Sequence, residues 1–591
     1  MKNNLVLYPD KENLLEDYCN IFFEERILYE LDSKILKKNK HIVEKPILYN
    51  NNQRLDSFEK CEKIFNLIMD DIYIILNKTH QVNWKKKSWE ILIGHWLKKF
   101  IYIVFFKYQN IKNIFNKYEI SNVFLSSSDN NEVATHETWE IYNLSIDKEW
   151  SWILSSKIIE NIDNSKLTFD KSTTIKKNFY EKKTFYERTH DNLSIKSKLL
   201  KKLSHMVNFF FNNNNNLITN TYLPIIEEKK LEILFNQIPR VYSTPKINYE
   251  PINHNLRKNI KITKDDFCIE SKIIRDLITF YLPTFAVENF KNLKLAVDKN
   301  NYPLNPKFIY TSNLFEADEA FKYFVADNLS SSKPAKYIVG QHGNSYFTRI
   351  DNNFANEITS CDYFLSWGDK NAGDKKIINL FNFKHLNNKK NEKQGRKLLI
   401  ILRSLGYQAV PYDRWHEGNK EFDIIKKFIL SIKNDFKDDI IIRLHQTFNY
   451  RYKFFVKKFL NGLEDFKIDF GYNKIENLAI DSKIIIFNYD STGFLESLIS
   501  NKPSICFYPN IFNHLNYDCV KYYQLLKDSK IIFDDETELR IHLESIWEDP
   551  MTWWNSKKVE DARNTFSKMF SKPQNNNPLK SIKEKIIEKL N

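Results

Sequence analysis

The residue types best suited to chemistry follow a short apolar run near the end of the chain. Ile484–Phe487 is predicted to be a buried strand, with a helix beginning shortly after it. A helix start presents unpaired backbone N–H groups and the positive end of the helix dipole, so it suits a phosphate or carboxylate. A carboxylate one turn inside such a helix could meet a ribose or sugar hydroxyl. The candidate residues of this unit are Asp490, Ser491, Thr492, Gly493 and Glu496.

These residues also have a purely structural interpretation. Asp, Ser and Thr are good helix caps, so one of Asp490, Ser491 and Thr492 is expected there for capping alone. Capping explains less well a glycine at position 493 and a carboxylate at position 496 that point to the same helix end. The combination therefore favours a binding site.

A second candidate loop, Gly340–Asn344, directly follows a predicted strand. Its two glycines flank Gln341 and His342, and Gly343 allows the backbone to approach a ligand closely. His342 is a candidate general base or a donor to a phosphate. The alternative is a structural turn in which the histidine caps the strand end.

Two further loops follow predicted strands in the C-terminal half. Arg403 comes after Lys397–Leu402, where it could pair with a diphosphate or carboxylate or simply lie at the surface. Arg443 and His445 lie at the end of Asp439–Leu444. His445 is placed to contact a nucleotide phosphate, whereas Arg443 alternates with apolar residues and has a buried salt bridge as its alternative.

Composition excludes several function classes. The 591 residues require two or three domains, and 42% hydrophobic residues supply their cores. The formal charge of +14 accompanies a general abundance of Lys, Asn, Ile, Phe and Tyr. Since no Arg-rich stripe or nucleic-acid-binding signature is present, no nucleic-acid partner is predicted. An anionic substrate or membrane surface stays compatible with the charge.

Motif searches exclude other chemistries. The 6 cysteines form no C-x-x-C pair, which indicates buried thiols in a reducing compartment. No clustered ligand spacing supports a metal, so no metal site and no cofactor beyond a co-substrate are predicted. The P-loop, the dinucleotide fingerprint and the G-x-S-x-G elbow are also missing from the sequence.

Strands alternate with helices from about residue 290, which predicts two α/β lobes facing a cleft. The predicted divisions are a mainly helical N-terminal region at 1–290 that contributes to the first lobe, the α/β part of that lobe at 291–373, a polar linker at 374–395, a second lobe at 396–548 and a helical tail at 549–591.

Within the N-terminal region, residues 12–29 and 57–76 have helical apolar spacing, and Asn122–Leu125 resembles a strand. The tryptophans at 84, 89 and 96 are interpreted as helix packing. The apolar window 89–108 contains His95, Lys98 and Lys99, so a core helix is favoured over a membrane span. A cytoplasmic protein is expected, with peripheral attachment to the cytoplasmic membrane as an open alternative.

Gly340-Gln-His-Gly343, the Arg443-Leu-His445 loop and Asp490-Ser-Thr-Gly-Phe-Leu-Glu496 resemble motifs of bacterial surface-polysaccharide transferases with the GT-B fold. Over most of its length the chain is similar to the LIC12162 family of transferases, which is tied to surface carbohydrate biosynthesis. The second-lobe motifs are also similar to those of capsule Kdo transferases of the KpsC and KpsS type. Gln446 replaces the proline of that pattern and the spacing before Gly493 is shorter, so the cradle carries over better than CMP specificity.

The resemblance implies a GT-B-like glycosyltransferase that needs no metal. Its expected substrates are a nucleotide-activated sugar, with CMP as one option, and a surface polysaccharide or glycolipid acceptor. In this scheme Ser491, Thr492, Gly493 and His445 hold the donor phosphate, Glu496 orients a hydroxyl, and Arg403 or Arg443 offsets charge on the leaving phosphate. His342 is the candidate base. A CDP-linked glycerophosphate-type transferase and a non-catalytic assembly scaffold stay open as alternatives.

Overall fold

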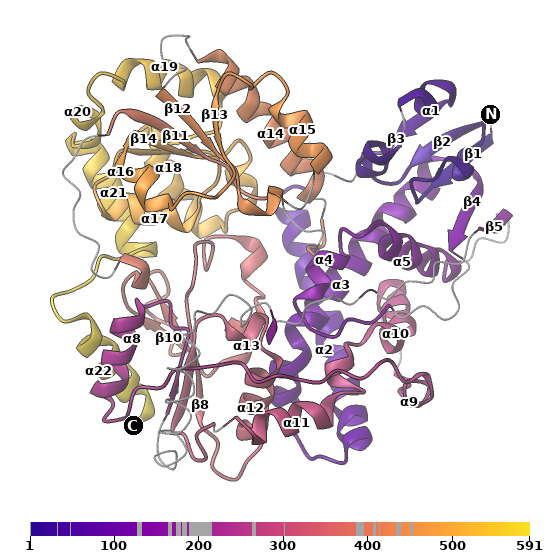
Figure 1. Cartoon of the computed structure of the whole chain (residues 1–591), viewed down its shortest axis with the longest axis horizontal. Helices are drawn as coiled ribbons and strands as arrows, with labels where there is room; N and C mark the ends of the chain where they lie inside the picture. The colour runs from indigo at the N-terminus through magenta and orange to yellow at the C-terminus, as the bar shows by residue number, and fades with distance from the viewer. Residues whose placement is uncertain are drawn as a thin grey trace.

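The computed structural model contains three parallel β-sheets within the residues that it describes (Figure 1). Those residues are 2–31, 33–45, 47, 49–126, 133–162, 168–172, 179, 186–187, 216–262, 268–300, 302–385, 395–405, 409–412, 414–432, 439–449 and 453–591. We call the three units the N-terminal sheet, the first lobe and the second lobe.

The N-terminal sheet has the strand order β3-β2-β1-β4-β5, and every neighbouring pair is parallel. Its strands are β1 (Lys2–Val6), β2 (Tyr18–Phe22), β3 (His41–Val43), β4 (Ile120–Ser126) and β5 (Thr168–Ser172). The helices around it are α1 (Ser33–Lys38), α4 (Glu140–Leu144) and α5 (Lys148–Glu160), with 3-10 turns η1 (Lys11–Asn13) and η2 (Glu25–Glu30).

This sheet corrects the predicted helix at 12–29, which contains β2 and two 3-10 turns instead. Three buried asparagines in the middle of the sheet explain the error. Asn4 donates to Asn20 at 2.8 Å, and Asn122 donates to Asn4 at 3.1 Å, so their amides satisfy one another across three strands. Asparagine is depleted in strands and hides the alternating pattern that indicates one.

Two long helices connect the N-terminal sheet to the first lobe. α2 (Asn51–His80) begins with a capping box between Asn50 and Gln53, and α3 (Lys86–Lys117) contains the apolar window. Trp89 stacks on Phe290 with ring centroids 5.3 Å apart, and Trp84 lies 4.9 Å from Trp89. The tryptophans are therefore packing residues, as the sequence analysis predicted. In the part of the chain that is described, no helix combines the length and apolar character needed to span a membrane.

The first lobe is a parallel sheet in the order β10-β9-β8-β7-β6. Its strands are β6 (Leu217–Ile218), β7 (Phe308–Thr311), β8 (Lys336–Gly340), β9 (Tyr363–Ser366) and β10 (Ile377–Asn379). Its helices are α8 (Ile225–Leu234), α11 (Phe290–Asp298), α12 (Glu319–Leu329) and α13 (Asn356–Ser360), whereas α10 (Ile269–Tyr281) packs against α2 and α3 and α9 (His254–Lys258) packs against α10. The structure differs from the sequence prediction in that β10 lies inside the expected linker 374–395.

The second lobe has the order β13-β12-β11-β14-β15-β16, which is the 3-2-1-4-5-6 order of a Rossmann fold. Its strands are β11 (Lys397–Ile401), β12 (Ile440–Arg443), β13 (Lys467–Asp469), β14 (Ser482–Phe487), β15 (Ser504–Phe507) and β16 (Ile532–Phe533). Its helices are α14 (Arg414–Ser431), α15 (Lys453–Leu460), α16 (Ile475–Ile480), α17 (Thr492–Ile499), α18 (Val520–Asp528) and α19 (Glu536–Ile546). The strand predicted at Ile484–Phe487 and the helix predicted after it are both present, as β14 and α17.

The C-terminal helices cross back to the first lobe. α20 (Pro550–Trp554) and α21 (Lys557–Phe570) cover the second lobe, whereas α22 (Pro578–Leu590) lies beside α8 on the first (Figure 1). Where the chain crosses, Asn382 N donates to Lys572 O at 2.9 Å and Asn382 Nδ2 donates to Ser571 Oγ at 3.0 Å. The two connections between the lobes are thus bonded to each other. Gly368 packs there so tightly that a Cβ would lie 2.2 Å from Met569 O.

Candidate active site between the two lobes

The loop after β8 touches the start of α17 in the opposite lobe. Asn344 N donates to Thr492 Oγ1 at 3.2 Å, and Asn344 Nδ2 donates to the carbonyl oxygen of Asp490. A Cβ built on Gly343 would lie 3.4 Å from Thr492 Oγ1. Two motifs that are 146 residues or more apart in sequence therefore meet at the carboxyl ends of their strands.

Gln341 shapes this loop from inside. The side chain is 3% exposed, donates to Gly343 O at 2.9 Å and accepts from Trp367 N at 2.9 Å. Gly340 packs against Ser312, whose Oγ would lie 2.4 Å from an added Cβ. Gln341 thus holds the loop conformation, and Gly340 allows the strand end to approach its neighbour.

His342 is the end of a polar chain in the first lobe. Its Nδ1 lies 3.0 Å from Tyr346 Oη, and that hydroxyl donates to Glu357 Oε1 at 2.8 Å. Because the tyrosine proton is used on Glu357, Nδ1 of His342 is the donor to Tyr346 in this arrangement. The proton assignment follows from the hydrogen-bond network. It leaves Nε2 of His342 as an acceptor.

The loops around His342 carry strained backbone. The φ angles of Asn220 and Tyr222, after β6, are 49° and 64°. Those of Ser345 and Phe347, after β8, are 73° and 63°. Bulky residues rarely adopt positive φ, and such strain gathers at functional sites. The ring centroid of Tyr222 lies 5.6 Å from that of His342, so the two strained loops are neighbours.

The α17 N-terminus retains donors for a ligand. Ser491 is the N-cap, and its Oγ accepts from Phe494 N at 3.1 Å. The N–H groups of Thr492 and Gly493 occupy the first two helical positions and have no acceptor inside the helix. The helix dipole adds partial positive charge at the same place. This end of α17 has the chemistry to receive an anionic oxygen.

Glu496 lies one turn further along α17 and is half-buried. Burial raises the pKa of its carboxyl group, and the positive charge of Lys384 opposes that rise. Lys384 Nζ also lies 4.4 Å from the ring centroid of Tyr222. Glu496 is therefore connected through Lys384 and Tyr222 to the surroundings of His342.

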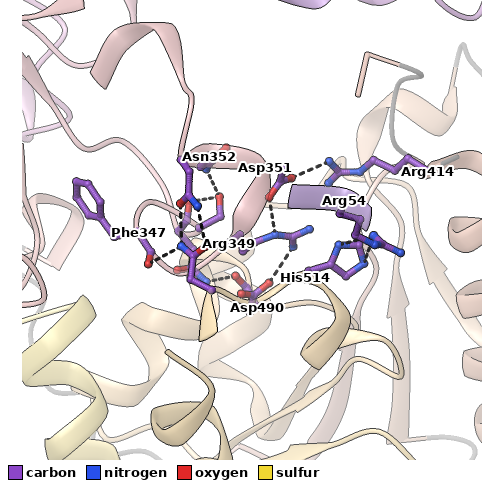
Figure 2. Close-up of polar contacts among 12 residues, drawn as sticks. Arg54, Phe347, Arg349, Asp351, Asn352, Arg414, Asp490 and His514 are labelled. Atoms are coloured by element: carbon purple, nitrogen blue, oxygen red, sulfur yellow. Dashed lines mark hydrogen bonds and ion pairs between the residues drawn. The ribbon is translucent and has the colours of Figure 1, made fainter. Parts of the chain in front are cut away.

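Asp490 is fully engaged in an ion network between the lobes (Figure 2). The residue as a whole is 4% exposed, and its carboxylate accepts a hydrogen bond from Tyr523 Oη at 2.8 Å. Arg349 Nη1 lies 3.4 Å from Asp490, and Arg349 Nε lies 3.2 Å from Asp351. Burial raises the pKa of Asp490, and Arg349 opposes the rise. This residue bonds the lobes together.

A second group of buried charges lies beside this network and includes a residue of the N-terminal region (Figure 2). Arg414 Nη1 lies 3.3 Å from Asp351, and Arg54 on α2 forms an ion pair with Glu417. Arg54 Nη1 also lies 3.0 Å from His514 Nδ1. α2 is thereby attached to the second lobe through buried charges.

The remaining predicted residues have partners within the second lobe. Arg403 is 7% exposed and pairs with Glu421, while Arg443 pairs with Asp469 and so matches its salt-bridge alternative. His445 is exposed at the carboxyl end of β12, with Nδ1 2.9 Å from Thr447 Oγ1.

Sequence reasoning missed several residues beside His342. Asn344 was within reach, since it belongs to the same short motif. Lys99 could also have been recognised, because a lysine within an apolar helix is expected to face a polar partner or a cavity. Tyr346, Glu357 and Glu316 are brought in by the fold and stand in no recognisable spacing.

A model of one protein family matches residues 4–586, which is nearly the whole chain. The chain belongs to the LIC12162 family of transferases. No curated protein matches it. The α/β fold is GT-B-like, with two parallel-sheet lobes whose strand ends meet, as predicted. The second lobe has the Rossmann strand order, whereas the first-lobe strands lie in the order in which they follow one another along the chain.

Solved structures with similar folds are distant. A variant of the wall teichoic acid polymerase TagF is 15% identical, over 50% of this chain and 74% of that one, with a TM-score of 0.29. A UDP-glucose:anthocyanidin 3-O-glucosyltransferase in complex with UDP is 9% identical, over 63% of this chain and 99% of that one, with a TM-score of 0.28. The spinosyn rhamnosyltransferase SpnG is 8% identical, over 50% of this chain and 76% of that one, with a TM-score of 0.27.

Proposed function

We propose that this LIC12162-family transferase moves a sugar from a nucleotide-sugar donor to a polysaccharide or glycolipid acceptor at the cytoplasmic face of the membrane. The observation that carries the proposal is the meeting of the His342 loop with the α17 N-terminus. A base and an anion-binding helix end lie on opposite lobes there. Transfer between two bound substrates needs this arrangement.

The donor phosphates are proposed to bind the N–H groups of Thr492 and Gly493. Support comes from their unfilled hydrogen-bonding capacity and from the helix dipole. His445, at the carboxyl end of β12 and two strands from β14, is the proposed second phosphate contact. Glu496 accepts a hydroxyl of the ribose or the sugar, since a half-buried carboxylate binds such a donor strongly.

His342 is proposed to remove the proton from the acceptor hydroxyl. The acceptor oxygen then forms a bond to the anomeric carbon while the bond from that carbon to the phosphate oxygen breaks. The proton moves to Nε2 of His342, and the bonding electron pair leaves with the nucleotide phosphate. Tyr346 and Glu357 keep Nδ1 protonated, which orients the imidazole for this task.

A nucleotide screen tests the proposal. The purified chain is melted with CMP, CDP, UDP, GDP and dTDP and with sugars linked to each. A true donor at a hundred times its Kd adds about 2.7 kcal/mol of stability. The matching nucleotide-sugar is then incubated with the protein, and release of free nucleotide is measured. Failure of every compound to stabilise the protein contradicts the proposal, and a glycerol-linked CDP donor as the sole hit favours the phospho-alcohol alternative.

The variant Glu496→Gln sharpens this test. It keeps the size of the side chain and removes the carboxylate, so donor affinity and turnover are expected to fall while the melting temperature without ligand is unchanged. The matched control is Glu476→Gln, which changes a nearby carboxylate on α16. Equal loss in both variants would contradict a specific role for Glu496.

A further inference from the structure

A small pocket lies beside His342 on the side facing α3. Its volume is about 150 Å³, and its wall includes Lys99 from α3, Glu316 from the loop after β7, and Glu357. A water occupies ~30 Å³ in the liquid, so the pocket holds about five waters. That space accommodates one sugar ring.

Two charged side chains in this wall are uncommitted. Lys99 and Glu316 are half-buried, and neither makes an ion pair or a hydrogen bond within the described part of the chain. Lys99 Nζ lies 5.5 Å from the ring centroid of Tyr102 and 5.9 Å from that of Tyr142. Burial lowers the pKa of Lys99 and raises the pKa of Glu316. Both groups would gain from a polar ligand.

Other charges that line the pocket are already neutralised. Lys98 Nζ lies 2.9 Å from Glu62 Oε2, and Asp351 is bonded to two arginines, Arg349 and Arg414. These pairs contribute little net charge to a ligand in the pocket. His95 is held neutral, because burial lowers its pKa well below the usual value.

The balance of the uncompensated groups decides which ligand fits. One ammonium, Lys99, lines the pocket together with the carboxyl groups of Glu316 and Glu357. Glu357 accepts from the hydroxyl of Tyr346 and lies 4.0 Å from Nδ1 of the neutral His95, so no cation is paired with it among the described residues. A ligand carboxylate would gain one cation and meet two acidic groups. Sugar hydroxyls can donate to the carboxyl groups and accept from the lysine, so an uncharged ring satisfies all three.

We propose that this pocket is the acceptor subsite and that it takes one uncharged, hydroxyl-rich sugar ring, with Lys99 and Glu316 as the residues that set this specificity. The proposal rests on the transferase function proposed above. It also assigns a task to the N-terminal region, since α3 and α4 form one wall of the pocket and α3 supplies Lys99, while the first lobe forms the opposite wall. The hydroxyl nearest His342 is the one that becomes glycosylated.

Saturation-transfer NMR with defined sugars tests the subsite. The probes are the methyl glycosides of glucose, galactose and mannose, compared with methyl glucuronide and methyl galacturonide. At least one neutral glycoside is expected to bind the wild-type chain at least fivefold more tightly than its uronic counterpart. The variant Glu316→Lys puts two ammonium groups in the pocket and is expected to reverse this preference.

Matched controls separate a pocket effect from general charge. Lys112→Met changes an exposed lysine on the same helix and is expected to leave binding unchanged, whereas Lys99→Met weakens the neutral glycoside. Circular dichroism and the melting temperature verify folding of each variant. Uronide preference in the wild type, no binding of any neutral glycoside, or an unchanged preference in Glu316→Lys overturns the proposal. Loss of nucleotide binding with intact glycoside binding would instead refute the transferase function and leave the sugar pocket standing.

Discussion

His342 and Asp490 both follow a strand of a parallel sheet, and their loops touch, yet their side chains are used differently. Asp490 has a hydrogen bond and an ion pair and is almost completely buried. His342 is half-buried, and among the described residues its hydrogen bond is made through Nδ1. Polar residues at strand ends thus divide into a committed group, which joins the lobes, and an uncommitted group, which is available to substrates.

The comparison predicts that the two groups respond to mutation in separable ways. Changes in the committed group should lower the free energy of unfolding, since they leave a buried charge without its partner. Changes in the uncommitted group should lower turnover and leave the melting temperature where it was. A residue that moved both quantities would break the division.

The largest expected effect is on turnover in His342→Ala. Loss of a general base lowers the rate about 10²–10⁴-fold. Nucleotide release from the donor identified in the screen measures the rate, and the melting temperature is expected to match that of the wild type. A rate within threefold of the wild type would remove His342 from the mechanism.

Asp490→Ala is expected to have the next largest effect, on stability. It removes one of the two carboxylates around Arg349 and the acceptor of Tyr523. Removing one partner of a buried pair costs about 3 kcal/mol or more. Urea unfolding measures the loss, and Ser500→Ala, close to the other end of α17, is the control. A loss below 1 kcal/mol would place Asp490 outside the committed group.

A smaller effect concerns pH and His514. Burial, reinforced by nearby arginines, lowers the pKa of this histidine well below 6.5 in the folded protein. The unfolded chain therefore takes up a proton that the folded chain refuses, so stability is present above pH 6.5 and is lost as the pH falls. Between pH 6.5 and 5 this one proton is worth about 2 kcal/mol.

His514→Gln keeps an acceptor for Arg54 and cannot be protonated. Its unfolding free energy is expected to fall less than that of the wild type over this pH range, in denaturant titrations at matched ionic strength. His80 and His136, with pKa values lowered to about 4, contribute equally in both proteins. Identical pH slopes would show that His514 is protonated in the folded network.

The second lobe and the N-terminal sheet show what sequence reasoning can reach. The second-lobe strands are runs of Ile and Leu buried on both faces, such as Ile484–Ile486, so their pattern predicts strands directly. The N-terminal sheet repeats the 3-2-1-4-5 part of the same order. Its central strands contain asparagines that are satisfied only when the sheet has formed, so local patterns could not reveal it.

The site residues also divide into those that local sequence predicts and those whose role depends on distant parts of the chain. The Gln341–Gly343 and Ser491–Gly493 motifs are local, since a strand, a turn and a helix start are each encoded within a few residues. Whether an arginine after a strand is committed depends on a distant partner, such as Glu421 for Arg403. Sequence spacing does not contain that information. Lys99 and His342 line the same pocket because α3 packs against the first lobe.

The bonded pair of crossings at Asn382, Ser571 and Lys572 has a mechanical consequence. Because the two connections are hydrogen-bonded side by side, they act as one hinge. A rotation of one lobe relative to the other turns about that hinge, and a sliding motion of the lobes at this point would break the hydrogen bonds. Displacement then grows with distance from the hinge. The ion pair between Arg54 on α2 and Glu417 on α14 joins the N-terminal region to the second lobe, so a rotation of the second lobe would have to stretch it.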